Sequence, residues 1–145
     1  MIDKRFVETK LSNVQSYFKE LENTLTYSDQ EIKKDFLKLR ALERILQLIV
    51  DEIVDINNHI IRYANLRIPD DFQSSFLVLA ENKILPEGFA KSIAPVVGLR
   101  NRLVHRYEKI DLDILLNATR KNKRDFKEYV KHIFEFLTSD FGGLS

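Results

Sequence analysis

The sequence predicts an all-α protein, a bundle of about five helices that forms one domain over residues 1–145. Only four glycines and three prolines interrupt the 145 residues, and no segment of appreciable length alternates apolar and polar residues as a half-buried strand does. Apolar residues instead recur every three or four positions, which is the period of an amphipathic helix. A hydrophobic content of 44% with 31% charged residues supplies both a core and a solvated surface.

The first two predicted helices are the longest. The first spans about Asp3 to Leu25, and its apolar residues form a single stripe: Val7, Leu11, Val14, Phe18, Leu21 and Leu25. After the turn "TYSD", Ser28 and Glu31 form a capping box that opens a second helix reaching about Ala64. Its stripe alternates spacings of three and four: Leu39, Leu42, Leu46, Ile49, Ile53, Ile56 and Ile60. Such regularity implies near-parallel packing against another helix, in a bundle or across a dimer.

Three shorter or later helices complete the bundle. Pro69 and Pro86 bracket a helix near residues 72–83. A fourth helix begins after Pro86 and carries Phe89, Ile93, Val97 and Val104 on one face. The last covers residues 112–137, with Phe126, Val130, Ile133 and Leu137 inside and Lys121, Lys123, Arg124, Lys127 and Lys131 largely outside.

Composition excludes several kinds of function. The chain has no cysteine, so disulfides, thiolate metal sites and thiol nucleophiles are impossible. Its charged N-terminus lacks the apolar region of a signal peptide, and no segment approaches the ~18 apolar residues of a membrane span, so we expect a cytoplasmic protein. Net charge is +1, but residues 96–132 hold ten Lys or Arg against five Asp or Glu. This excess favours a polyanionic partner, or else is the solvated face of a C-terminal helix.

The stretch "GLRNRLVHRYEKID", residues 98–111, concentrates polar chemistry at the end of an apolar run. Arg100 falls where the apolar face needs a hydrophobic residue, so it must be paired or line a cleft. On one continuous helix, Arg100 and His105 point about 140° apart, and His105 and Tyr107 about 200° apart. The three therefore converge only if the helix ends near Val104 and continues as extended chain, or if two chains build the site.

The segment "RNRLVHRY" resembles the R-x4-6-H motif of the HEPN ribonuclease superfamily and, more narrowly, the R-x4-H-x-Y motif of HepT toxins. The long segment "LRALERILQLIVDEIVDINNHI" and the segment "ILPEGFAKSI" extend the similarity over most of the chain. The resemblance implies that Arg100 and His105 form the catalytic pair and that Asn101 assists them. It also implies that Tyr107 receives AMP from a partner, an MntA-like nucleotidyltransferase antitoxin. Proteins of this superfamily act as homodimers whose two motifs face each other across a basic cleft.

The residue types suit metal-independent RNA cleavage, for which no cofactor is expected. RNA carries its own nucleophile, the 2′-hydroxyl, so the enzyme needs a base near neutral pH and a cation for the charge that builds on phosphorus. His105 supplies the base and Arg100 the cation. Arg102 and Arg106, which interleave the motif, are candidates for binding RNA phosphates. The expected products are a 2′,3′-cyclic phosphate and a 5′-hydroxyl.

Other readings of the sequence remain. The chain could be a catalytically inert helical module whose basic side docks RNA or an acidic protein. A nucleotide-handling enzyme is disfavoured because no Gly-rich phosphate loop is present. Asp51, Asp55 and His59 follow one another at helical spacing, a pattern compatible with a metal ion. We interpret these three residues as a solvated helix face and expect no metal.

Overall fold

The computed structural model describes residues 1–105 and 109–139, and this part of the chain is entirely helical, without strands. The all-α prediction is therefore confirmed. Seven helices occur in the described ranges: α1 (Lys4–Thr24), α2 (Asp29–Lys34), α3 (Phe36–Tyr63), α4 (Ser75–Glu81), α5 (Glu87–Ile93), α6 (Val96–His105) and α7 (Leu112–Thr138). None of these helices carries an apolar stretch long enough to cross a bilayer.

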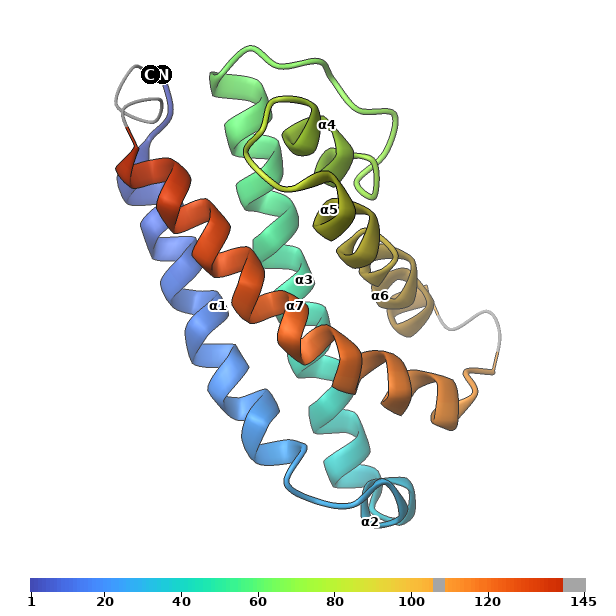
Figure 1. Cartoon of the computed structure of the whole chain (residues 1–145). Helices are drawn as coiled ribbons and strands as arrows, with labels where there is room; N and C mark the ends of the chain where they lie inside the picture. Colours follow the sequence, from blue (N-terminus) through green and yellow to red (C-terminus); the bar gives the residue numbers. More distant parts are fainter. Residues whose placement is uncertain (106–108, 140–145) are drawn as a thin grey trace.

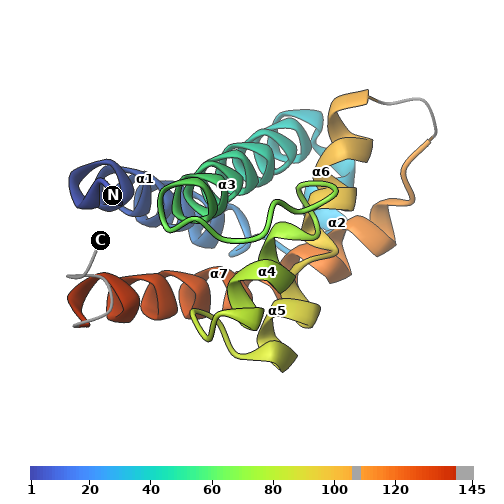
Figure 2. The same cartoon turned by 90° about the horizontal axis from the view of Figure 1, so that it is seen from above.

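Three long helices form the body of the molecule (Figure 1). The α1 helix packs against both α3 and α7, and the three run side by side along the length of the molecule. Seen from above, α1 and α3 lie on one side and α7 on the opposite side, while α4, α5 and α6 cluster at the end away from α1 (Figure 2). The α6 helix packs against α3, so the motif that it carries lies next to the longest helix.

The predicted apolar stripes form the core. Every residue of the α3 stripe is buried, from Leu39 to Ile60. On α1 only Phe18 departs, because it is partly buried at the edge of the core. The last predicted helix is confirmed as α7, and Asp111 caps it by accepting a hydrogen bond from the Asp113 backbone N–H at 2.9 Å. An acidic side chain at this position satisfies an N–H that has no partner inside the helix.

The second predicted helix is divided at Asp35. The capping box of Ser28 and Glu31 is confirmed, but the helix it opens, α2, ends at Lys34. Asp35 then adopts an extended conformation and accepts a hydrogen bond from the Leu37 backbone N–H at 3.0 Å, which caps α3. Aspartate favours such a cap over a helix interior because its short side chain competes for backbone donors.

The fourth predicted helix is also divided, and of its predicted inner face Phe89, Ile93 and Val97 are buried whereas the prediction for Val104 was wrong. The α5 helix ends at Ile93 and α6 starts at Val96, so Pro95 lies at the break. Proline has no N–H for the helix ladder and clashes with the preceding turn. Val104 shares a face of α6 with Val97 but lies one residue before the end of the helix, where it is 37% exposed, while Leu99 and Leu103 are buried.

Candidate active site on helix α6

The side chain of Arg100 crosses from α6 to α3. Its Nε donates to Asp51 Oδ1 at 2.7 Å, and the Arg100 side chain is 25% exposed. Arg100 also lines a pocket, so the expectation that it must be paired or line a cleft holds on both counts. A charged guanidinium at this half-buried place is compensated by the carboxylate across the helix interface.

Asn101 completes the support of the guanidinium. Its Oδ1 accepts a hydrogen bond from Arg100 Nη1 at 3.3 Å. Asp51 and Asn101 thus occupy two nitrogens of the fork, and within the described residues Nη2 makes no hydrogen bond. A planar guanidinium held in this way is suited to binding an anion through its remaining donors.

The pocket beside Arg100 has a volume of about 360 Å³ and lies between α3, α6 and the turn before α4. Its lining combines valines, carboxylates, amides and one aromatic ring: Val50, Asp51, Val54, Asp55, Asn58, Phe72, Val97, Arg100 and Asn101. We refer to it as the Phe72 pocket.

His105 is the last residue of α6 and is exposed. It follows Asn101 by one helical turn, so the two side chains share a face of the helix. Arg102 is exposed on the same helix and makes no ion pair within the described residues. Arg106 and Tyr107 lie outside the described residues. The structure thus joins Arg100 to Asn101 and leaves the helix intact up to His105.

Asp51, Asp55 and His59 do not converge on a common centre. Asp51 pairs with Arg100, and Asp55 Oδ2 pairs with Lys10 Nζ at 3.0 Å. His59 Nε2 accepts a hydrogen bond from the Asp3 backbone N–H at 3.0 Å. Each side chain is thus engaged with a different protein partner, and no cluster of three metal-ligating side chains occurs in the described ranges.

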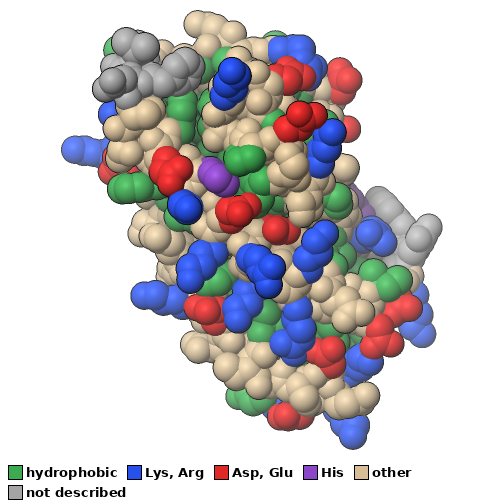
Figure 3. Space-filling view, in the orientation of Figure 1, with side chains coloured by type: hydrophobic (Ala, Val, Ile, Leu, Met, Phe, Trp, Pro, Cys, Tyr) green, Lys and Arg blue, Asp and Glu red, His purple; other side chains and the backbone are tan. Residues whose placement is uncertain are grey.

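The basic residues of the C-terminal half are divided between two surfaces. Arg100, Arg102 and His105 belong to α6, whereas a band of Lys and Arg side chains covers the middle of α7 (Figure 3). The exposed Lys and Arg residues on α7 are Arg120, which pairs with Asp29, and Lys121, Arg124, Lys127 and Lys131. The basic residues of α6 adjoin the motif, where they could contact a polyanionic partner. Those of α7 form a solvated helix face, so each interpretation of the charge excess applies to one of the two helices.

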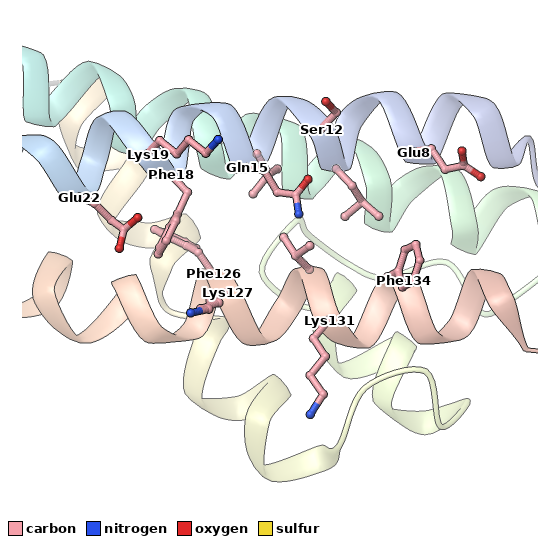
Figure 4. Close-up of a pocket in the computed structure, with 13 residues that line it drawn as sticks. Glu8, Ser12, Gln15, Phe18, Lys19, Glu22, Phe126, Lys127, Lys131 and Phe134 are labelled. Carbon is pink, nitrogen blue, oxygen red and sulfur yellow. The ribbon is translucent and has the colours of Figure 1, made fainter.

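A second hollow, of about 820 Å³, runs between α1 and α7 (Figure 4). Phe18 and Phe126 face each other across it, and Phe134 lies further along α7. Val130, predicted to lie inside the core, lines this groove and is only partly buried. Arg100, Asn101 and His105 do not contribute to the lining, so this groove is separate from the candidate active site.

Two residues of the candidate site were not found by sequence reasoning. The helical spacing groups Asp51 with Asp55 and His59, whereas its partner in the structure, Arg100, is 49 positions away on α6. The sequence predicts that Phe72 opens a helix near residues 72–83, whereas in the structure it precedes α4 and lines the pocket. Asp51 adjoins buried aliphatic residues of α3 such as Val50, but its side chain is 39% exposed, so the sequence carried no clear signal that it needs a partner.

Comparison with known proteins identifies close relatives. Residues 14–133 match the family described as Ribonuclease HepT-like. The mRNA nuclease HepT of Shewanella oneidensis is 30% identical over 122 residues, covering 83% of this chain and 90% of the relative. The tRNA nuclease HepT of Aphanizomenon flos-aquae is 33% identical over 138 residues, covering 94% of this chain and 92% of the relative. A solved structure of the tri-AMPylated Shewanella oneidensis HEPN toxin with MNT antitoxin superimposes with a TM-score of 0.81 at 27% identity, covering 88% of this chain and 96% of the toxin.

Proposed function

The chain belongs to the HepT-like ribonuclease family, and from this premise we propose that it is the toxin of a toxin–antitoxin pair and cleaves RNA without a metal ion. The observation that carries the proposal is the guanidinium of Arg100, which Asp51 and Asn101 hold at the rim of a pocket. The whole chain, residues 1–145, acts as one HEPN-like domain.

Each motif residue has a distinct role in the proposed reaction. Nη2 of Arg100, which makes no hydrogen bond within the described residues, binds the scissile phosphate and stabilises the charge that develops on phosphorus. His105 removes the proton of the 2′-hydroxyl, because a nitrogen of the neutral imidazole ring can accept it. Asn101 keeps the guanidinium oriented, and Arg102 and Arg106 bind neighbouring phosphates of the RNA.

Two copies of the chain form the working enzyme. Because α6 is helical up to His105, Arg100 and His105 of one chain point about 140° apart. A dimer that brings two motifs face to face supplies both groups to one phosphate. The exposed Val104 follows Arg100 by one turn on the same face, where a partner subunit would cover it. Sedimentation analysis should give a particle of two chains, and a monomer at micromolar concentration would contradict this part of the proposal.

The antitoxin silences the enzyme at Tyr107. The structural relative with AMP groups was solved with an MNT antitoxin, which supports a nucleotidyltransferase as the partner of this chain. In the proposed transfer the phenolic oxygen of Tyr107 attacks the α-phosphorus of ATP, and pyrophosphate leaves. The added AMP is a bulky anion two residues from His105, so it repels and blocks an incoming RNA phosphate.

The decisive experiment is cleavage of RNA in excess EDTA. We would compare the wild type with His105→Ala and with a matched control, His132→Gln, which removes a histidine of α7. Substrates should include both mRNA and tRNA, because the two relatives are named for one each. We expect the wild type and His132→Gln to cleave and His105→Ala to lose at least a hundredfold in rate.

The ends of the fragments test the chemistry separately. Cyclic phosphate and 5′-hydroxyl ends are expected, whereas 3′-hydroxyl ends or a strict Mg²⁺ requirement contradict the mechanism. An intact mass of the purified wild type excludes prior AMP on Tyr107. If the mass shows that the wild type is unmodified and the wild type still does not cleave RNA, the chain is an inert binding module and the proposal fails.

A further experiment isolates Tyr107. We expect Tyr107→Phe to retain cleavage, because the hydroxyl takes no part in the proposed reaction. The same variant should take up no AMP from ATP and the cognate nucleotidyltransferase. Labelling of Tyr107→Phe at the wild-type level would refute the assignment.

A further inference from the structure

The Phe72 pocket has the size and lining of a small-ligand site. Its volume of about 360 Å³ lies near the lower end of the ~300–1,000 Å³ typical of such sites. Three valines, Val50, Val54 and Val97, form an apolar lining, while Asn58 and Asn101 add amide groups. Arg100, which we assign to the scissile phosphate, stands in the same lining, so the pocket adjoins the place of reaction.

We propose that the Phe72 pocket is a subsite for one unpaired base of the RNA substrate, with the base stacked on Phe72 and its neighbouring phosphate bound at Arg100. The inference rests on the proposed ribonuclease function and adds a determinant of substrate binding to it. Proteins that recognise single-stranded RNA commonly stack splayed-out bases on aromatic side chains and bond their edges with polar groups.

Phe72 has the exposure that stacking requires. Its side chain is 58% exposed although it lines the pocket, so one part of the ring surface contacts protein and another part meets solvent. A solvent-exposed aromatic ring beside a catalytic arginine loses its contact with water when a flat base covers it. Stacking on an aromatic ring tolerates any base because every base has a π-face.

The backbone of Phe72 is anchored by a buried chain of hydrogen bonds. Tyr129 Oη donates to Asn57 Oδ1 at 2.6 Å, and Asn57 Nδ2 donates to Ser75 Oγ at 2.9 Å. Ser75 Oγ in turn donates to the carbonyl oxygen of Phe72 at 2.6 Å. Side chains of α7, α3 and α4 therefore hold one backbone position of a surface turn.

The same turn is fixed locally as well. The Asp71 carboxylate accepts hydrogen bonds from the backbone N–H and the hydroxyl of Ser74, at 2.7 and 2.6 Å. These bonds lower the pKa of the Asp71 carboxyl, with the hydroxyl contributing most. A ring on a fixed turn binds with a smaller entropic cost than a ring on a mobile loop.

The charges of the pocket select a base over a phosphate. Asp51 and Asp55 contribute two carboxylates to the lining against the single guanidinium of Arg100. Because Asp51 is paired with Arg100 and Asp55 with Lys10, the interior of the pocket offers a phosphate little net attraction, whereas a base is uncharged and often carries an amino donor. The side chain of Asn58, which makes no hydrogen bond in the described part of the chain, offers both a donor and an acceptor to the edge of the base.

The test is a comparison of two oligonucleotides with the same backbone. Both are short, single-stranded and 2′-O-methylated, so they lack the nucleophile and are not cleaved; one carries bases and the other is abasic at every position. Affinities for wild type, Phe72→Ala, Phe72→Tyr and Ile68→Ala are measured by fluorescence anisotropy at one fixed salt concentration. Ile68 is a matched control because it is 83% exposed and lines the neighbouring hollow with Phe72 but not this pocket.

We expect Phe72→Ala to weaken binding of the base-bearing oligonucleotide by about 5- to 150-fold and to leave binding of the abasic one unchanged. Phe72→Tyr should retain wild-type affinity, and Ile68→Ala should change neither. Equal weakening of both oligonucleotides, or of neither, overturns the inference. Equal weakening together with a change in sedimentation would instead identify the pocket as a contact between copies of the chain.

The two proposals fail in different ways. Cleavage by the wild type with no base-dependent effect of Phe72→Ala leaves the ribonuclease in place and removes the subsite. A base-dependent effect without cleavage retains the subsite on a protein that only binds RNA. A wild type that binds both oligonucleotides equally well also overturns the subsite.

Discussion

Arg100 Nε lies 2.7 Å from Asp51 Oδ1, so one ion pair joins the helix that carries the motif to the longest helix of the bundle. The carboxylate takes the Nε edge of the guanidinium and leaves the terminal nitrogens for other partners. Asp51 therefore acts as a positioning residue for Arg100. The two side chains are 25% and 39% exposed, and ion pairs within reach of solvent add little to stability, so the effect of Asp51 is expected mainly in catalysis.

Replacing Asp51 by alanine should slow RNA cleavage without unfolding the protein. We expect the rate at saturating RNA to fall by about tenfold to a hundredfold, because a displaced guanidinium no longer meets the phosphate correctly. Asp51→Asn keeps an oxygen acceptor and should retain an intermediate rate. Single-turnover cleavage with the wild type and both variants measures the effect.

The control for Asp51 is a second ion pair between arginine and a carboxylate. Arg67 Nη2 contacts Glu81 Oε1 at 2.7 Å, and both side chains are about half exposed. Glu81→Gln removes this pair and should leave cleavage unchanged. Equal rates for Asp51→Ala and wild type would show that Arg100 needs no support from Asp51.

The buried hydroxyl of Tyr129 gives a prediction about stability. Tyr129→Phe removes the donor that lies 2.6 Å from Asn57 Oδ1 and leaves a buried acceptor without its partner. We expect the free energy of unfolding to fall by about 1–3 kcal/mol. Tyr27→Phe removes a hydroxyl from an exposed tyrosine and should change it by less than about 0.5 kcal/mol. Chemical denaturation measures both, and equal effects would contradict the role of the buried chain.

Much of the fold could be predicted because the apolar stripes report directly which residues are buried. The stripe of α3 and the capping box at Ser28 required only local spacing. The divisions at Asp35 and Pro95 were missed although both residues disfavour a helix interior. Phe89, Ile93 and Val97 are buried on either side of Pro95, and only Val104, next to the end of α6, is exposed, because spacing alone does not show where the neighbouring helices stop covering a face.

Less of the candidate site than of the fold could be predicted from the sequence. Arg100 and His105 stand out by their spacing and their resemblance to a motif. The partners that shape the site come from distant parts of the chain: Asp51 is 49 positions before Arg100, and Phe72 depends on a bond chain that reaches Tyr129. Local periodicity carries no information on such contacts, because the packing of α3, α4, α6 and α7 creates them.

Replacing the buried Asp125 by asparagine should stabilise the folded protein. Its side chain is only 9% exposed, and Oδ2 has no hydrogen-bond partner among the described residues. Burial raises the pKa of the Asp125 carboxyl, partly offset by Lys121, so the folded state holds the proton more tightly than the unfolded state. The charged form therefore costs stability at neutral pH, and this cost disappears as pH falls through the raised pKa. We expect Asp125→Asn to be more stable than wild type by about 1 kcal/mol at pH 7.5 and to lose that advantage at acidic pH, measured by denaturation.

The half-buried, neutral His59 should make the folded state less stable as pH falls, which is the opposite of the effect expected for Asp125. Its Nε2 accepts the Asp3 backbone N–H, and its ring lies between Phe6 and Tyr63 with centroid distances of 4.5 and 4.6 Å. Burial lowers the pKa of His59, an effect that Asp3 opposes, so the folded state favours the neutral ring. The resulting stabilisation is complete above the unfolded pKa of about 6.5 and is lost as pH falls through the lower folded value. His59→Gln keeps an acceptor but cannot titrate in this range, so the stability difference between wild type and variant should shrink from pH 7.5 to pH 5. A difference that stays constant over this range would show that protonation of His59 does not break its contact with Asp3.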